Sequence, residues 1–211
     1  AGAAREAADA KFSELLAWVE QNLCPGLGTA KAKWLPRRVI VFTEYADTKD
    51  WLKRRFADAL GDDDPEEVRV ATFHGGMSDD ARQRVIDAFN VDPNEHPLRI
   101  LIATDAAREG VNLQNHCADL FHFDIPWNPG RMEQRNGRID RRLQREREVR
   151  CHYFVLPERA QDRVLEVLVE KADTIVKELG SLPPVLQRSI EGLLVKGIRP
   201  GQVDGLREQL G

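Results

Sequence analysis

The chain has 211 residues, of which 42% are hydrophobic, and its 31 lysines and arginines against 35 aspartates and glutamates give a formal net charge of -4. This length predicts one domain with a substantial core and helical appendages. The acidic balance excludes a general attraction for polyanions, so a nucleic-acid site has to be local. No apolar run approaches the roughly 20 residues of a membrane helix, and we expect a soluble, cytoplasmic protein without a membrane partner.

The three cysteines, Cys24, Cys117 and Cys151, lie far apart in the sequence and form no C-x-x-C pair. This spacing argues against a disulfide framework and fits a reducing cytosol. His116, Cys117 and His122 lack the spacing of metal ligands, and we expect them to have packing roles. The sequence therefore predicts no metal site.

In chain order, the first segment, 1–36, is expected to be a helical linker from a preceding domain. Apolar residues recur there at helical spacing over about 4–23. The main domain is predicted to span 37–157, and C-terminal helices with a tail to span 158–211. Gly180, followed by two prolines, is expected to end the long helix of this last segment.

The main domain alternates short β-branched runs with longer helical patterns. Strands are predicted at 38–43, 68–72, 99–103, 119–123 and 149–155, and helices at 46–60, 79–90, 129–141 and 158–179. Ser78 is placed to cap the second of these helices, whose first turn is acidic. The alternation predicts an α/β fold in three layers, with a parallel sheet covered by helices on both faces and helical extensions at both ends.

Polar clusters follow the predicted strands, at the edge where ligands collect in parallel α/β sheets. They are Thr43-Glu44-Tyr45, His74-Gly75-Gly76, Thr104-Asp105 with Glu109-Gly110-Val111-Asn112, and Asp124 through Pro129. Taken singly, Gly75-Gly76 predicts no more than a turn, and His74 no more than a packed loop histidine.

An arginine-rich segment, 131–150, follows the last of these clusters. It holds eight arginines, no lysine and four acidic residues. One interpretation is a solvated, salt-bridged surface helix. The other is contact with an anion, which the preference for arginine favours, because a planar guanidinium suits bidentate contact with phosphate.

Taken together and in order, these residues resemble the C-terminal helicase domain of superfamily-two motors. The Swi/Snf branch is the most similar, especially its bacterial members, although Arg142-Leu143 departs from the Ile-Gly that the branch usually has. The residues that carry the resemblance are Arg38 to Tyr45 (motif four), His74-Gly75-Gly76 with Arg82 and Phe89, Thr104-Asp105 with Gly110, Asn112 and Leu113 (motif five), Gln134 to Arg141 (motif six, Q-x-x-G-R-x-x-R), Asp124 to Pro129, and the brace-like helix from Asp162 to Lys171.

The resemblance implies that 37–157 is a second RecA-like domain, and that ATP with Mg²⁺ binds between it and a first RecA-like domain of the same polypeptide. The first domain would supply the Mg²⁺ ligands. Arg138 and Arg141 would act as arginine fingers, and Gln134 would help to order them. Gly110 and Asn112 would lie near the nucleotide.

The resemblance also implies a nucleic-acid partner, with duplex DNA expected. Thr43, Gly75 and Thr104 would hold the phosphate backbone of one strand. The predicted function is the C-terminal half of an ATP-dependent DNA translocase or helicase. Because the sequence contains no G-x-x-x-x-G-K-[ST], we expect the isolated chain not to hydrolyse ATP.

Two alternatives stay open from the sequence. The first is a strand-separating helicase that acts on DNA or RNA. The second is a non-catalytic interaction domain with a degenerate motor fold, against which the intact Arg138 and Arg141 count.

Overall fold

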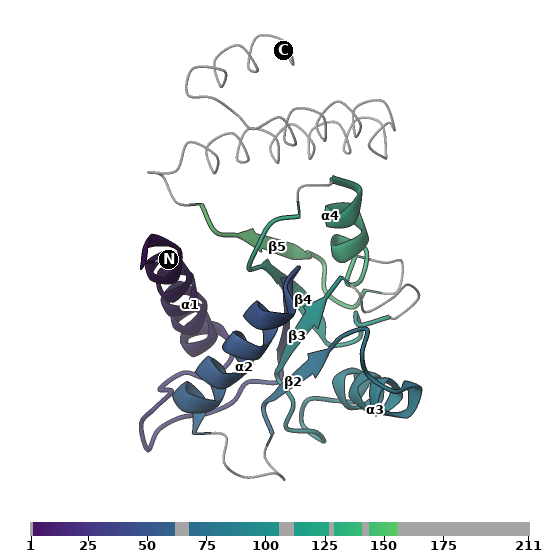
Figure 1. The fold of residues 1–211 in the computed structure, drawn as a ribbon. Helices are drawn as coiled ribbons and strands as arrows, with labels where there is room; N and C mark the ends of the chain where they lie inside the picture. The colour runs from purple at the N-terminus through teal and green to yellow at the C-terminus, as the bar shows by residue number, and fades with distance from the viewer. Residues whose placement is uncertain (1, 62–67, 106–111, 127–128, 141–143, 156–211) are drawn as a thin grey trace. The chain divides into compact units, whose positions relative to one another are not determined.

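The computed structural model describes residues 2–61, 68–105, 112–126, 129–140 and 144–155 (Figure 1). The strands are β1 (Arg38–Thr43), β2 (Val70–Phe73), β3 (Ile100–Thr104), β4 (Cys117–His122) and β5 (Arg150–Tyr153), and the helices are α1 (Gly2–Asn22), α2 (Ala46–Leu60), α3 (Asp79–Asn90) and α4 (Pro129–Asn136). The predictions for 158–211 lie outside the described residues.

The chain divides into two compact units. The first comprises Ala1–Ile125 and Arg135–Tyr153, and the second comprises Pro126–Gln134 and Phe154–Gly211. The first unit holds the whole sheet, in the order β2-β3-β1-β4-β5, and every pair of neighbouring strands is parallel. In the second unit, the structure describes little beyond the first six residues of α4.

Helices cover the sheet on both faces. Figure 1 shows α1 and α2 together on one side and α3 on the other. Alternation along the strands explains this arrangement, because neighbouring side chains point to opposite faces. Ile40 and Leu120 join Phe89 of α3 in one buried core. On the other face, Trp18 of α1 meets Phe121 edge to face, with ring centroids 5.0 Å apart. The predicted three-layer arrangement is confirmed.

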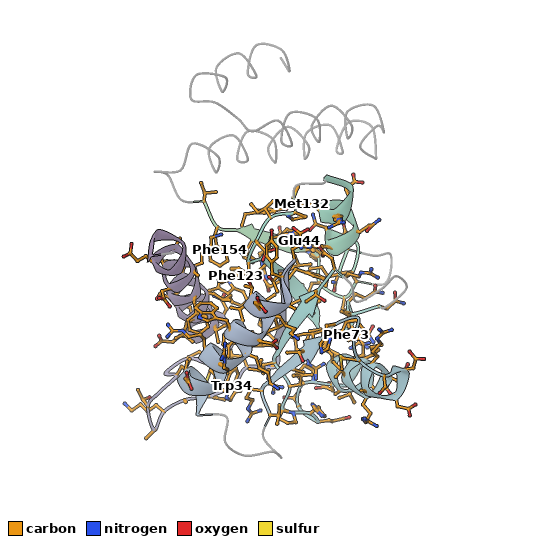
Figure 2. The ribbon with its side chains drawn as sticks, viewed as in Figure 1. Trp34, Glu44, Phe73, Phe123, Met132 and Phe154 are labelled. Carbon is orange, nitrogen blue, oxygen red and sulfur yellow. The ribbon has the colours of Figure 1, made fainter. Side chains whose placement is uncertain are left out.

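The two faces can also be followed in the side chains. Figure 2 shows Phe73 on the α3 side of the sheet, where it joins the core around Phe89, and Phe123 on the α1 side. The ammonium group of Lys11 in α1 lies 5.9 Å from the centre of the Phe123 ring. Trp51 of α2 lies 6.0 Å from the same ring, so α1 and α2 share one apolar surface with the end of the sheet.

Local signals explain the elements whose bounds match the prediction, which are β1, α2 and α3. The Ser78 hydroxyl accepts a hydrogen bond from the Ala81 amide, 3.3 Å away, and so caps α3 as expected. Gly61 ends α2 with a left-handed φ of 63°, a conformation that glycine adopts without a steric penalty. The other strands differ from their predicted bounds by one or two residues.

The predicted helix 129–141 is wrong at its C-terminal end, because α4 ends at Asn136. The Arg138 amide donates to the Arg135 carbonyl over 3.0 Å, and the Ile139 amide to the Asn136 carbonyl over 3.1 Å. These bonds close a tight turn in place of another α-helical turn. Arg131 and Arg135 therefore lie in α4, whereas Arg138 lies in the turn that follows it.

Within the described ranges, none of the helices combines the length and the apolar character that crossing a membrane requires. Cys24 and Cys117 are buried free thiols, and Cys151 is a half-buried one. In the same part of the chain, no group of three or more histidine, cysteine, aspartate or glutamate side chains is placed to hold a metal ion.

Candidate functional site

The carboxyl ends of the strands bring three of the predicted site residues to one edge of the sheet. Thr43 and Thr104 are the last residues of β1 and β3, and they lie side by side as partners in the parallel ladder. Gly75 follows the end of β2, which is the next strand along. The sheet therefore places together the residues that the sequence proposed for holding a phosphate backbone.

The Thr43 side chain is fully buried and holds an internal partner. Its hydroxyl donates to one carboxylate oxygen of Asp124, while the Glu44 amide donates to the other over 2.7 Å. Burial raises the pKa of Asp124, and these two hydrogen bonds act against the rise. The hydroxyl of Thr43 thus connects the ends of β1 and β4 in this arrangement.

The turn after β2 is held from the side by α3. The Arg82 guanidinium donates to the Gly75 carbonyl over 2.5 Å, and the Met77 amide donates to the His74 carbonyl over 3.3 Å. A Cβ atom added at Gly76 would stand 3.4 Å from the His74 ring, which is ordinary van der Waals contact. Burial is the main cause that lowers the pKa of His74, with Lys49 adding to it. The turn is therefore fixed by α3 and presents backbone atoms at the edge.

A buried arginine, whose role the sequence did not single out, lies at the centre of this edge. The guanidinium of Arg135 is 2% exposed and grips the Asp105 carboxylate in a bidentate manner, with Nε 2.6 Å and Nη2 2.7 Å from its two oxygens. Its Nη1 donates to the Asp124 carbonyl over 2.8 Å, and the guanidinium carbon lies 5.4 Å from the centre of the Phe42 ring. One side chain thus joins the loops after β3 and β4.

His122 completes this cluster as a neutral ring. Its pKa is lowered to about 4, mainly by burial and also by the charge of Arg135, and the hydrogen bond to Asn136 offsets only part of this effect. His122 Nε2 lies 2.9 Å from the Asn136 amide oxygen, so in the neutral ring Nε2 carries the proton. Nδ1 then remains an acceptor, and it lies 3.4 Å from Nη1 of Arg135. The ring also stacks on Tyr153, with centroids 4.8 Å apart.

The main chain around Arg138 connects the predicted nucleotide residues. The Arg138 carbonyl accepts from the Leu113 amide over 3.3 Å, directly after Asn112. The Asn112 carbonyl in turn accepts from Nδ2 of Asn90 in α3 over 2.8 Å. The structure therefore brings Arg138 and Asn112 into one neighbourhood.

Three further residues were predicted for this site, namely Gln134, Gly110 and Arg141. Gln134 is exposed and belongs to the second compact unit. Gly110 and Arg141 lie outside the described residues. The one signal that pointed to Arg135 was its place inside the motif-six run, since its charge alone favoured an exposed position.

With this geometry established, comparison with known proteins decides the family. The model of the helicase conserved C-terminal domain matches residues 27–142, which is more than half of the chain. The chain belongs to this family. The predicted membership is therefore confirmed, and the motifs at the carboxyl edge are those of a helicase C-terminal domain.

Two bacterial relatives agree with this. The chain is 33% identical over 156 residues to the uncharacterized ATP-dependent helicase YqhH of Bacillus subtilis, covering 74% of this chain and 26% of the relative. It is 29% identical over 143 residues to the RNA polymerase-associated protein RapA of Yersinia enterocolitica, covering 68% of this chain and 14% of the relative. The matched segment is thus about a quarter or less of either relative, and the predicted similarity to bacterial Swi/Snf-type proteins is confirmed.

Solved structures share the fold at low sequence identity. The C-terminal part of the Fun30 ATPase domain has a TM-score of 0.55 and 18% identity, over 89% of this chain and 54% of that one. The yeast DEAD-box splicing factor Prp28 has a TM-score of 0.56 and 23% identity, over 87% of this chain and 34% of that one. These likenesses confirm the predicted RecA-like fold.

Proposed function

We propose that this chain is the C-terminal half of an ATP-dependent DNA translocase or helicase, acting with a first RecA-like domain of the same polypeptide. The observation that carries the proposal is the buried Arg135–Asp105 pair, which ties the loop after β3 to the turn that bears Arg138. The Arg135–Asp105 ion pair is well fixed, because both of its hydrogen bonds are short and the arginine side chain is 2% exposed. A relative described as an ATP-dependent helicase supports the use of ATP.

Arg138 and Arg141 are the proposed arginine fingers, and Gln134 the residue that helps to order them. A bound ATP would supply the phosphoryl group on which negative charge accumulates during transfer. A guanidinium held in a fixed direction stabilises such charge without reorganising first. The hydrogen bonds of the Arg138 main chain to Arg135 and Leu113 fix the start of this side chain. Fingers of this kind contribute about 10³–10⁵ in rate in other NTPases.

The chemistry of the edge suits a nucleotide phosphate better than a metal ion. Both carboxylate oxygens of Asp105 accept hydrogen bonds from Arg135. The Asp124 carboxylate accepts hydrogen bonds from the Thr43 hydroxyl and the Glu44 amide. A magnesium ion needs free carboxylate oxygens, so we place its protein ligands in the first RecA-like domain. Gly110 and Asn112 are proposed to lie against the nucleotide.

Nucleic acid is the proposed second partner, and duplex DNA the form that is expected. The Gly75 backbone and Thr104 would contact phosphates of one strand, and Thr43, whose buried hydroxyl is bonded to Asp124, would hold the end of β1 beside them. Such contacts fix the position of a protein on DNA and carry no sequence information. The formal charge of -4 means that the affinity has to come from this edge and not from the surface at large.

The test compares two proteins in a steady-state ATPase assay with saturating duplex DNA. The 211-residue chain is expected to show no turnover, whereas a polypeptide that also contains the first RecA-like domain is expected to show DNA-stimulated turnover. Robust hydrolysis by the 211-residue chain, abolished by Arg138→Ala, would contradict the half-site assignment. An unwinding assay on the longer polypeptide then separates translocation from strand separation.

A further inference from the structure

A second polar site lies at the opposite edge of the sheet. The amino-terminal ends of β1, β4 and β5 border a pocket of about 400 Å³. Arg38 and Arg150 begin β1 and β5, while Thr43 and Thr104 end β1 and β3. The pocket is therefore separated from the proposed motor site by the length of the strands.

Four arginines line this pocket, together with His116 and two carboxylates. The arginines are Arg37, Arg38, Arg145 and Arg150, and the carboxylates are Asp119 and Glu146. Cations thus outnumber carboxylates locally, although the chain as a whole carries a net charge of -4. Such a local excess attracts an anion into a concave site.

Asp119 is shared by two arginines and a histidine, so it neutralises only part of this charge. It accepts from Arg37 over 2.9 Å, from Arg150 over 2.8 and 3.2 Å, and lies 3.0 Å from Nε2 of His152. Burial raises the pKa of Asp119, but the hydrogen bonds from His152 and Arg150 outweigh burial and hold the pKa well below its ordinary value. One ionised carboxylate is therefore the shared partner of two arginines, Arg37 and Arg150.

Arg38 is a buried cation that forms no salt bridge among the described residues, although the charge of Asp92 acts on it. It is 1% exposed, and within the described part of the chain it donates only to the carbonyls of Phe89, Val91 and Leu98. Its Nη2 has no hydrogen-bond partner there. Burial lowers the pKa of Arg38 to about 10, with repulsion from Arg99 adding to the effect. A nearby anion would relieve this unfavourable environment.

Arg145 and His116 complete the lining. Arg145 is exposed, and it forms no salt bridge with the residues that the structure describes. Burial lowers the pKa of His116, and Arg145 and Arg38 lower it further. The Arg145 side chain is therefore available to a ligand. The pKa of His116 depends on the charges in the pocket.

We propose that this pocket binds a phosphate group through Arg145, with Arg37 and Arg150 as flanking donors and Arg38 as a buried positive charge beneath it. Guanidinium groups present several donors in one plane, which fits the oxygens of phosphate. The group can come from a small phosphorylated molecule or from a nucleic-acid backbone, because both present the same oxygens. The site goes beyond the proposed motor function and does not depend on it.

Inorganic phosphate titrated into the full chain, followed by NMR, tests the proposal. Phosphate is expected to produce saturable shifts at Asn115 and His116 and to raise the pKa of His116, since an anion favours the protonated ring. Arg145→Ala is expected to weaken phosphate binding about tenfold, the loss of one or two charge-assisted hydrogen bonds. Glu146→Gln is expected to strengthen binding, because it removes a negative charge from the lining.

Arg147→Ala is the matched control, since Arg147 is exposed, lies two residues from Arg145 and does not line the pocket. It should bind phosphate as the parent chain does. Absence of saturable shifts, or equal affinities for the parent chain and Arg145→Ala, would overturn the proposal. Equal affinities would also show that phosphate binds at another surface of the chain.

A short DNA duplex, added to the phosphate-loaded chain, distinguishes the two sources of the phosphate group. If the duplex displaces phosphate and Arg145→Ala weakens duplex binding, the group belongs to a nucleic-acid backbone. If phosphate stays bound and duplex binding is unaffected by Arg145→Ala, the group belongs to a small molecule. Because this readout is independent of ATP hydrolysis, failure of the motor assignment leaves it unchanged.

Discussion

Arg135 and Asp105 form a two-bond pair at the carboxyl edge of the sheet, with donor–acceptor distances of 2.6 and 2.7 Å. The arginine is 2% exposed, whereas the Asp105 side chain is 20% exposed. The pair joins the residue that follows β3 to the penultimate residue of α4. It therefore fixes the path of the chain into the turn that carries Arg138.

Asp105→Asn is expected to destabilise the fold by about 2 kcal/mol, because it removes the charged two-bond partner of a buried guanidinium and leaves only Asp124, 3.8 Å from Nη2, as a counter-charge. Urea unfolding followed by tryptophan fluorescence measures this loss. Asp79→Asn is the control, since the Arg82–Asp79 pair is 3.7 Å long and its carboxylate is fully exposed. That variant should lose much less stability than Asp105→Asn, since it removes only an exposed ion pair and one of the two carboxylates in the first turn of α3. Equal stability of Asp105→Asn and the parent chain would show that the pair contributes nothing to the fold.

The stability of the fold is expected to fall as the pH decreases from about 6.5 to about 4, because of His122. Burial holds the pKa of His122 at about 4, so in this window the unfolded state binds the proton and the folded state does not. The folded state loses about 3 kcal/mol of stability through this residue, none of it above pH 6.5 and nearly all of it by pH 4. Asp119, whose pKa is lowered in the folded state, acts only below its ordinary value of 3.8.

Unfolding free energies of the parent chain and His122→Gln at several pH values measure this effect. The variant should show the smaller loss between pH 6.5 and pH 4, whatever its stability at neutral pH. Other histidines with lowered pKa values contribute equally to both proteins. Parallel pH profiles of the two proteins would rule out a buried neutral His122.

Thr43→Val is expected to destabilise the fold by about 1–3 kcal/mol, because it removes a donor from the half-buried Asp124 carboxylate at nearly constant side-chain volume. Thr43→Ser should retain most of the stability, since it keeps the hydroxyl. Urea unfolding of both variants measures the difference. If Thr43→Val keeps its stability but loses DNA affinity, the hydroxyl serves the nucleic acid and not Asp124.

Thr104→Ala is expected to weaken duplex binding several-fold for all sequences alike, as the loss of one phosphate contact would. Fluorescence anisotropy at several salt concentrations measures it in a protein with both RecA-like domains. The slope of log K against log[salt] should stay unchanged, because a neutral hydroxyl displaces no counterion from a phosphate. Thr29→Ala, in an exposed turn outside the strands, is the control. Unchanged binding and unchanged DNA-stimulated ATPase activity of Thr104→Ala would contradict the assignment.

The sequence predicted the elements whose signals are local. The β-branched run at the start of the main domain gave the bounds of β1, and the Ser78 cap with its acidic first turn gave those of α3. The parallel arrangement followed from the alternation of strands and helices. The order of the strands in the sheet could not be predicted in this way, because the pairing joins residues that are far apart in the sequence, such as Val39 with Ile100 in β3. Nothing local in the sequence records that pairing.

The position of Thr43 and Thr104 at the carboxyl edge could be predicted from the sequence, but the hydrogen bonds around them could not. Motif order placed Thr43 and Thr104 at one edge, and the sheet register confirms that they are neighbours. The burial of Arg135 could not be predicted, because an arginine in a charged run is usually solvated and its partner Asp105 is 30 residues away. The turn after Asn136 was missed for a similar reason, since Gly137 was the only local breaker in a helical pattern.

The central claim, that Arg138 and Arg141 act on the transferred phosphoryl group, is tested most directly by single-turnover and steady-state ATPase kinetics of Arg138→Ala and Arg138→Lys. The protein has to contain both RecA-like domains, and nucleotide affinity is measured in parallel. Both variants are expected to lower kcat by about 10³ or more with little change in affinity, because the contact is strongest in the transition state and an ammonium group does not reproduce the guanidinium fork. Equal losses of affinity and kcat, or rescue by lysine, would contradict the account.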